Sequence, residues 1–188
     1  MNFITKTIEN DEEYLRQRSE EIDFEKDDYK QYVKELTDYC LNNEEPNVLA
    51  LAAIQIGLPK RLVYIKNTNV EDLLNEETDE QRILINPVII SKKGKTKYWE
   101  TCVSCLDNMG LVTRPYEIIV EYYDVEQNIH RDTFVGFEST VLSHELDHLD
   151  GILHMDIAEE NIVMPLEERK EFRKTHGYEI ISKDCEYK

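Results

Sequence analysis

The spacing of hydrophobic residues predicts three helices in this chain. Between residues 28 and 42, apolar and aromatic side chains recur every three or four positions, which is typical of an amphipathic helix. The same spacing from Val141 to Leu149 predicts a second helix over 138–151, and Gly151 is typical of a helix C-terminus. A charged segment at 166–176 predicts a last helix.

Shorter apolar runs predict strands and the turns between them. The run at 118–123 is followed by turn residues and by 131–135, so these two segments predict a hairpin. Pro87 predicts an edge or a break in the strand region 83–90, and Gly94 predicts a turn in the basic segment 91–97. The sequence further predicts a buried segment that ends in a turn at 49–59 and a strand at 61–65. It predicts an exposed loop or a short helix at 67–82.

The predicted strands and helices do not alternate regularly along the chain, which favours the α+β class over a parallel α/β fold. A length of 188 residues suits one domain, and the sequence contains no repeat and no low-complexity linker. We therefore expect a single catalytic domain over residues 1–188, in which 166–188 forms a C-terminal helix and tail.

The charge of the chain excludes some classes of partner. It carries 40 acidic and 22 basic residues, for a net charge of −18, and such a surface repels DNA and anionic membranes. No apolar run is long enough to span a bilayer, and the first residues lack the pattern of a signal peptide, so we expect a cytoplasmic protein. Of the four cysteines only Cys102 and Cys105 are close together, which in a cytosolic chain indicates metal or redox chemistry.

The predicted helix over 138–151 carries an H-E-x-x-H motif. Residues four apart on a helix share a face, so His144 and His148 can bind one metal ion together. The intervening Glu145 can then reach a water at the ion and transfer its proton, which is the chemistry of amide hydrolysis. The alternative is a pair of surface histidines in a charged helix.

Two histidines leave a third protein ligand to be found. Glu168, twenty residues after His148, would complete the two-histidine, one-glutamate set of thermolysin-like peptidases, although it stands in a run of charged residues. Cys102 would supply a thiolate, which is a strong ligand for zinc or ferrous iron. Composition and spacing leave both candidates open.

Three motifs follow one another along the chain. They are 51–57, Leu-Ala-Ala-Ile-Gln-Ile-Gly; then Glu100-Thr101-Cys102-Val103-Ser104, followed by Arg114; and last 143–151, with its H-E-x-x-H. In this order they resemble the first, second and third motifs of the peptide deformylases, which remove the formyl group from the N-formylmethionine of nascent chains. With weaker matches at 14–16 and 85–87, the resemblance covers about residues 10–165.

The resemblance implies a fold and a set of roles. The fold would consist of mostly antiparallel sheets packed around a central helix that carries the H-E-x-x-H motif. The metal ligands would be Cys102, His144 and His148, with Glu145 as the general acid and base. Gln55 and the backbone N–H of Val103 would stabilise the charge that develops on the formyl oxygen. Glu100 and Arg114 would hold the ligands in place.

The resemblance also implies cofactors and partners. The cofactor would be one divalent metal ion, Fe²⁺ by preference, with Zn²⁺, Ni²⁺ or Co²⁺ as substitutes. The substrate would be an N-formylmethionyl peptide, so the protein would serve N-terminal methionine processing during protein biosynthesis. A C-terminal helix of family members can contact the ribosome, but the segment 166–188 has six acidic and six basic residues and offers no net positive charge for it.

Several positions near the expected substrate depart from the family's pattern. Val48, Ala50 and Thr101 stand where the family has glycines, which permit a close backbone approach. We therefore expect intact hydrolytic machinery with altered substrate preference or efficiency. The methionine pocket would be lined by residues from three segments: Leu49, Tyr98, Thr101, Phe137, Thr140 and Val141.

Two alternatives to a deformylase remain open on the sequence. One is the thermolysin-like metallopeptidase that uses Glu168, and the other is a low-activity or non-catalytic deformylase paralogue that binds peptide without turnover. The presence of Glu145 argues against the second, because a binding protein has no need of a proton-transfer group beside the ion.

Overall fold

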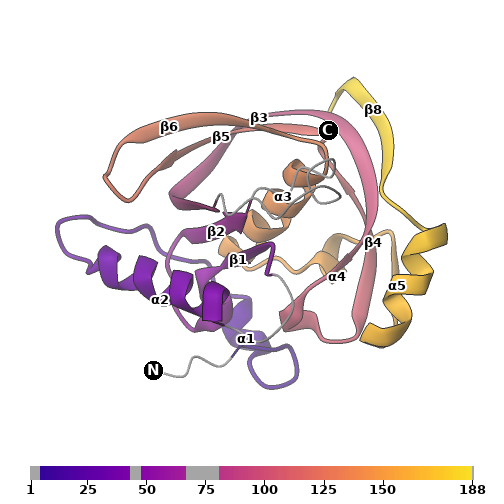
Figure 1. Cartoon of the computed structure of the whole chain (residues 1–188), viewed down its shortest axis with the longest axis horizontal. Coiled ribbons are helices and arrows are strands. Elements are labelled where there is room, and N and C mark those ends of the chain that lie inside the picture. The colour runs from indigo at the N-terminus through magenta and orange to yellow at the C-terminus, as the bar shows by residue number, and fades with distance from the viewer. Residues whose placement is uncertain (1–4, 43–47, 67–80, 188) are drawn as a thin grey trace.

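A computed structural model describes residues 5–42, 48–66 and 81–187 of the chain. Within these ranges the strands form one eight-stranded sheet whose pairings are all antiparallel. Figure 1 shows the sheet curving over and around the helix α3, with the helix α2 against one side and α5 against the other. None of the described helices is long and apolar enough to cross a membrane.

The elements follow one another from the short helix α1 near the N-terminus to the strand β8 near the C-terminus. Their bounds are α1 Glu12–Leu15, α2 Tyr29–Asn42, β1 Ala50–Ala52, η1 Ala53–Ile56, β2 Leu62–Lys66, β3 Gln81–Thr101, η2 Val103–Cys105, β4 Asn108–Arg114, β5 Glu117–Tyr123, β6 Ile129–Val135, α3 Phe137–Leu149, α4 His154–Ile157, β7 Glu160–Val163, α5 Leu166–Thr175 and β8 Glu179–Glu186.

The long strand β3 organises the sheet, because it pairs with β2, β4, β5 and β8. The turn predicted at Gly94 is wrong, since β3 runs through it without interruption. Gly94 has a φ of +70°, and a Cβ there would lie 2.6 Å from the carbonyl oxygen of Ser182. This glycine is therefore needed for the close approach of β8, not for a chain reversal.

Where Pro87 predicted an edge or a break, β3 continues, but its pairing with β5 shifts in register. Asn86 has a φ of +51°, and the pairing with β5 shifts between Ile85 and Val88. Such irregularities bend a strand and increase its twist. Figure 1 shows β3 curving from above α3 to the side of the molecule where α5 lies.

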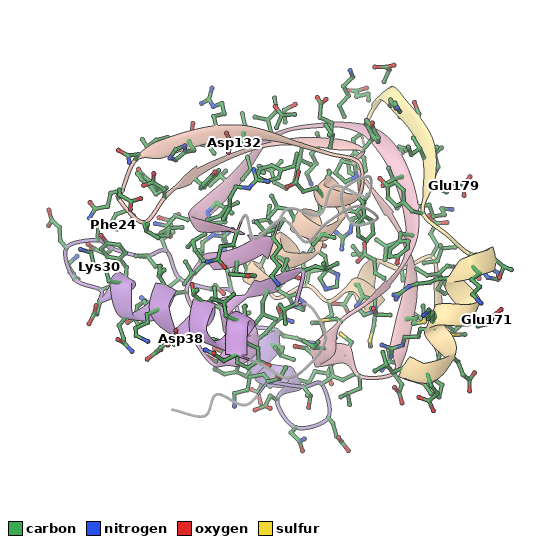
Figure 2. The ribbon with its side chains drawn as sticks, viewed as in Figure 1. Phe24, Lys30, Asp38, Asp132, Glu171 and Glu179 are labelled. Carbon is green, nitrogen blue, oxygen red and sulfur yellow. The ribbon has the colours of Figure 1, made fainter. Side chains whose placement is uncertain are left out.

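The helix α3 lies inside the molecule. Its Leu142, Leu146 and Leu149 pack with buried residues of β2, β5 and β6 in the main hydrophobic core. A second cluster joins α2 to β1 and β2. The labelled Lys30 and Asp38 on α2 and Glu171 on α5 carry their charges on the outside of the body (Figure 2).

The structure confirms the elements that have strong local patterns. The three predicted helices correspond to α2, α3 and α5, the predicted hairpin to β5 and β6, and the run at 61–65 to β2. The predicted tail after α5 contains the strand β8, which pairs with β3. The loop or short helix predicted over 67–82 falls largely outside the described residues, and Gln81–Arg82 already belong to β3.

Gly151, two residues beyond the end of α3, is expected to be intolerant of a side chain. Its φ is +74°, and a Cβ would lie 2.3 Å from the carbonyl oxygen of Arg16. We expect Gly151→Ala to lower the free energy of unfolding by about 1–3 kcal/mol, because backbone strain and steric overlap both oppose the folded state. Gly177→Ala is the control, since the nearest atom to its Cβ would be 3.8 Å away. Equal urea midpoints for the two variants would contradict this prediction.

Candidate functional site

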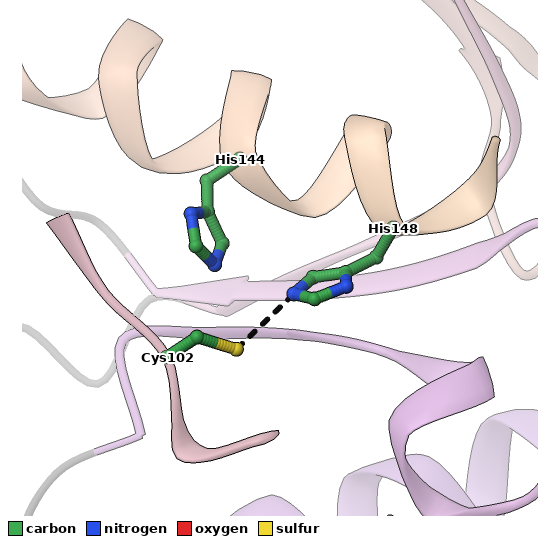
Figure 3. A group of neighbouring side chains, drawn as sticks. All are labelled: Cys102, His144 and His148. Carbon is green, nitrogen blue, oxygen red and sulfur yellow. Dashed lines mark hydrogen bonds between the residues drawn. The ribbon is translucent and has the colours of Figure 1, made fainter. Parts of the chain in front are cut away.

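Three buried side chains meet between the helix α3 and the end of the strand β3. His144 and His148 lie one turn apart on α3, and Cys102 follows the last residue of β3. The three ligand atoms all lie within 4.8 Å of one another. Figure 3 shows the thiol and the two imidazoles pointing toward a common space, with Cys102 Sγ 3.2 Å from His148 Nε2. The structure thus brings together the two helical histidines and one of the two candidates for the third ligand.

The donor set fits a divalent cation. One thiolate and two imidazoles suit zinc and ferrous iron, and three protein ligands leave positions open for water or substrate. Burial lowers the pKa of His144, but the neighbouring Cys102 and Glu100 outweigh it and raise that pKa well above its usual value. The surroundings therefore favour a positive charge at the place where a cation would sit.

Glu168, the other candidate for the third ligand, does not belong to this cluster. It is exposed on α5, and the group of metal-ligating atoms found among the described residues contains Cys102 instead. Sequence spacing left Cys102 and Glu168 as candidates for the third ligand, and the structure places Cys102 near the two histidines.

A buried ion pair lies behind His144. Glu100 accepts two hydrogen bonds from Arg114, at 2.7 and 3.0 Å, and lies 2.8 Å from His144 Nδ1. Arg114 also donates to Asp147 on α3. Burial raises the pKa of Glu100, but Arg114 and His144 outweigh this effect and bring the pKa to about 2. Glu100 is therefore a carboxylate that fixes the ring orientation of His144 and leaves its Nε2 free for a metal.

Removal of Arg114 is expected to destabilise the protein strongly. Arg114→Met would leave Glu100, which is 4% exposed, as a buried charge without its cation. We expect the free energy of unfolding of the metal-free protein to fall by about 3 kcal/mol or more. The same change at the exposed pair of Arg131 and Glu121 should cost less than about 1 kcal/mol. Equal losses in urea unfolding of Arg114→Met and Arg131→Met would refute the argument.

Glu145 lies next to the metal-ligand cluster and faces the cavity described below. It is 6% exposed, and burial raises the pKa of its carboxyl to about 7. Its Oε2 has no hydrogen-bond partner among the described residues. A carboxyl group with an unengaged oxygen and a pKa near neutrality is suited to accept and return a proton.

Two groups near Cys102 can donate hydrogen bonds into the site. Gln55 is buried in η1, where its Oε1 accepts from the backbone N–H of Ala52 and its Nε2 lies 3.3 Å from Cys102 Sγ and 3.1 Å from Ser104 Oγ. Val103 is the first residue of η2. The first N–H groups of a helical turn have no acceptor within it, so the Val103 N–H is open to a substrate oxygen.

A cavity of about 250 Å³ opens beside these groups. Its wall contains Gln55, Cys102, His144 and Glu145, together with the side chains that the sequence predicted for a substrate pocket. Those six are Leu49, Tyr98, Thr101, Phe137, Thr140 and Val141, and Val48 and Ala50 also line the cavity.

Sequence reasoning missed two residues near the site. No role was assigned to His154 from the sequence, but it is 1% exposed and its ring stacks on that of His144 at 5.6 Å. Arg173 on α5 lines the cavity and was not singled out at all. No local pattern marks either residue, because both reach the site through the packing of elements distant in sequence.

A buried helix that presents two imidazoles and a glutamate beside a cysteine thiol, within an antiparallel α+β fold, defines a metal-dependent hydrolase. The chain belongs to the polypeptide deformylase family, whose model matches residues 4–162. A peptide deformylase of Finegoldia magna is 35% identical over 150 residues, which are 79% of this chain and 85% of the relative. Peptide deformylase 2 of Clostridium acetobutylicum is 33% identical over 81% of this chain and 94% of its own length.

Solved structures agree with this assignment. A Synechococcus elongatus peptide deformylase in complex with actinonin is 25% identical, with a TM-score of 0.69 over 93% of this chain and 87% of that one. A Plasmodium falciparum peptide deformylase is 27% identical, with a TM-score of 0.67 over 91% of each chain. The predicted α+β fold, with antiparallel strands around the helix that carries H-E-x-x-H, is confirmed.

Proposed function

We propose that this chain is a metal-dependent amide hydrolase that removes the formyl group from N-formylmethionyl peptides of nascent chains. The observation that carries the proposal is the buried group of Cys102, His144 and His148, which lies beside Glu145 at the wall of a largely apolar cavity. We infer the reaction from the family and its named relatives, and we assign each group that the reaction needs to a residue of this chain.

Each side chain has a role in the proposed reaction. Cys102, His144 and His148 would hold a divalent cation, which when bound supplies Lewis acidity that polarises an amide carbonyl and acidifies water. Glu145 accepts the proton of the attacking water and delivers it to the leaving amine. Both transfers need a group whose pKa lies near neutrality, which burial provides here.

Two hydrogen-bond donors would stabilise the developing negative charge. We assign the Nε2 of Gln55 and the backbone N–H of Val103 to the formyl oxygen. Gln55 is suited to this role because its Oε1 is held by the Ala52 N–H, which orients the amide with Nε2 toward Cys102.

We propose that the resident ion is Fe²⁺, with Zn²⁺, Ni²⁺ or Co²⁺ able to replace it. Thiolate and imidazole ligands suit all four ions, and the ferrous preference rests on the resemblance to the family. A reducing compartment keeps such a thiolate available, and nascent chains are made in the cytoplasm, where we place the activity. All four cysteines are free.

The first side chain of the substrate would occupy the cavity. Tyr98, Phe137 and Val141 give it an apolar wall suited to a methionine side chain. Val48, Ala50 and Thr101 add side chains where the family has glycines, so we expect a peptide to lie differently here and substrate preference to differ.

A contact between the ribosome and α5 stays a prediction. Two of the four cations of this helix turn toward the protein, where Arg169 donates to the carbonyl of Leu106 and Arg173 to Thr101. The outer face offers Lys170 and Lys174, with acidic neighbours such as Glu171.

The decisive experiment is anaerobic purification, metal analysis, and a formate-release assay on formyl-Met-Ala-Ser. Acetyl-Met-Ala-Ser is the control for the acyl group, and an internally cleavable peptide tests for a thermolysin-like activity. We expect one ion per chain and formate release alone. Cleavage of the internal peptide would support the peptidase instead, and a bound ion without any turnover would indicate the non-catalytic paralogue.

A further inference from the structure

We propose that Arg173 is a specificity-determining residue that binds a carboxylate carried by the substrate. This inference rests on the proposed function, because it concerns the peptide that enters the same cavity. Arg173 lies on α5, beyond the region 4–162 that matches the family model, yet its side chain lines the cavity together with Glu145 and His144.

The position of Arg173 is defined by contacts with β3. One of its terminal nitrogens donates to Thr101 Oγ1 at 3.0 Å and more weakly to the carbonyl of Trp99 at 3.4 Å. Its guanidinium carbon lies 5.4 Å from the centre of the Tyr98 ring. Thr101 and Tyr98 also line the cavity, so the guanidinium is held at the wall by residues of the site itself.

Arg173 lacks an anionic partner within the described part of the chain. Its Nε is buried without any hydrogen-bond partner, and the contacts of the guanidinium are to a hydroxyl, a carbonyl and a ring. Arg169, one turn earlier on α5, is different: it donates to two backbone carbonyls and pairs with Asp107 at 3.5 Å. Arg169 thus has the contacts of a residue that fastens the helix, while Arg173 has no anionic partner among the described residues.

A cation without an anionic partner in the described part of the chain is unusual at a net charge of −18. The other cation near the site, Arg114, is bound to Glu100 and Asp147 behind the metal ligands. Among the described residues of the cavity wall, Arg173 is therefore the cation that is free to meet an anion from outside. A guanidinium donates charge-assisted hydrogen bonds to a carboxylate, which makes a carboxylate the favoured ligand.

The carboxylate could come from an acidic side chain after the first residue or from the C-terminus of a short peptide. Formyl-Met peptides with Glu or Gln at the second or third position, all amidated at the C-terminus, test the side chain. Formyl-Met-Ala-Ser with a free or amidated end tests the terminus. We compare kcat/KM of the anionic peptide with that of its neutral partner, and we expect the anionic peptide to be preferred. The ratio should be about fivefold for the pair whose carboxylate reaches Arg173. Added salt should lower this ratio.

Variants assign the preference to Arg173. In Arg173→Met the ratio should fall to about one, and Arg173→Lys should keep part of it. Lys170→Met removes the same charge from the exposed face of the same helix, and it should leave the ratio as in the native chain. A measurement of thermal unfolding separates this effect from a packing role, since lost packing lowers stability without altering the ratio.

The outcomes separate this inference from the proposed function. Turnover of all peptides without a charge preference, or a preference that survives in Arg173→Met, would overturn the role of Arg173 and leave the deformylase assignment intact. Absence of formate from every peptide would overturn the assignment. In that case, calorimetric binding of the Glu and Gln peptides by the native chain still tests the carboxylate site, and equal affinities would overturn it.

Discussion

Glu145→Gln is expected to retain the metal ion and to lose about a thousandfold in kcat for formate release. The amide has nearly the shape of the carboxyl group, so the cavity and the ligands should persist. It cannot accept the proton of the attacking water, and so the proton transfer at the centre of the reaction is removed. Steady-state kinetics on formyl-Met-Ala-Ser, with metal content measured on the same sample, would check this result.

The matched control is Glu138→Gln, the same change on the same helix. Glu138 pairs with Arg82 and does not line the cavity. Its substitution should leave kcat within about twofold of the native value, because sites away from the reacting atoms have small effects. A Glu145→Gln enzyme with near-native turnover would show that another group carries the proton, and our assignment of Glu145 would fail.

Cys102→Ala is expected to abolish stoichiometric metal binding, and with it turnover. The thiolate is one of three proposed ligands, and two imidazoles alone bind a divalent cation much more weakly. Cys105→Ala is the matched control, because Cys105 is buried three residues away and packs with Leu15 and Leu153 instead of pointing at the histidines. That variant should keep its ion and lose about 1–2 kcal/mol of stability from the small cavity.

Glu168→Gln completes this comparison, since Glu168 was the rival third ligand. Metal analysis after anaerobic purification should give about one ion per chain for Cys105→Ala and Glu168→Gln, and none for Cys102→Ala. The reverse pattern, in which Glu168→Gln loses the ion and Cys102→Ala retains it, would establish the thermolysin-like set and refute the one proposed here.

The parts of the site that could be predicted are those that share one helix. The four-residue spacing of His144 and His148 places both on one face of any α-helix, whatever the rest of the chain does. The apolar stripe through Leu142 and Leu149 predicted that helix correctly, and the pattern of 28–42 did the same for α2. Such predictions succeed because helical periodicity depends on neighbours in sequence.

Other features depended on partners far away in the chain. The local sequence around Gly94 predicts a turn, but the pairing of β3 with β5 and β8 keeps this residue in a strand. His154 has no local pattern that marks burial, and it is covered because α4 packs on β4. Long-range pairing overrides local preference in both cases, which a single sequence does not reveal.

The sequence by itself determined the helix that carries H-E-x-x-H, with the proposed ligands and the proposed proton-transfer glutamate on it, and, through three ordered motifs, the resemblance to a family. Only the tertiary structure decided which distant side chains face that helix. It brought Cys102 rather than Glu168 to the two histidines, placed Glu100 and Arg114 behind them, and carried Arg173 from the last helix to the cavity wall. The physical reason is that ligand geometry along one helix is set by backbone periodicity, whereas contacts between segments are set by how the sheet closes around it.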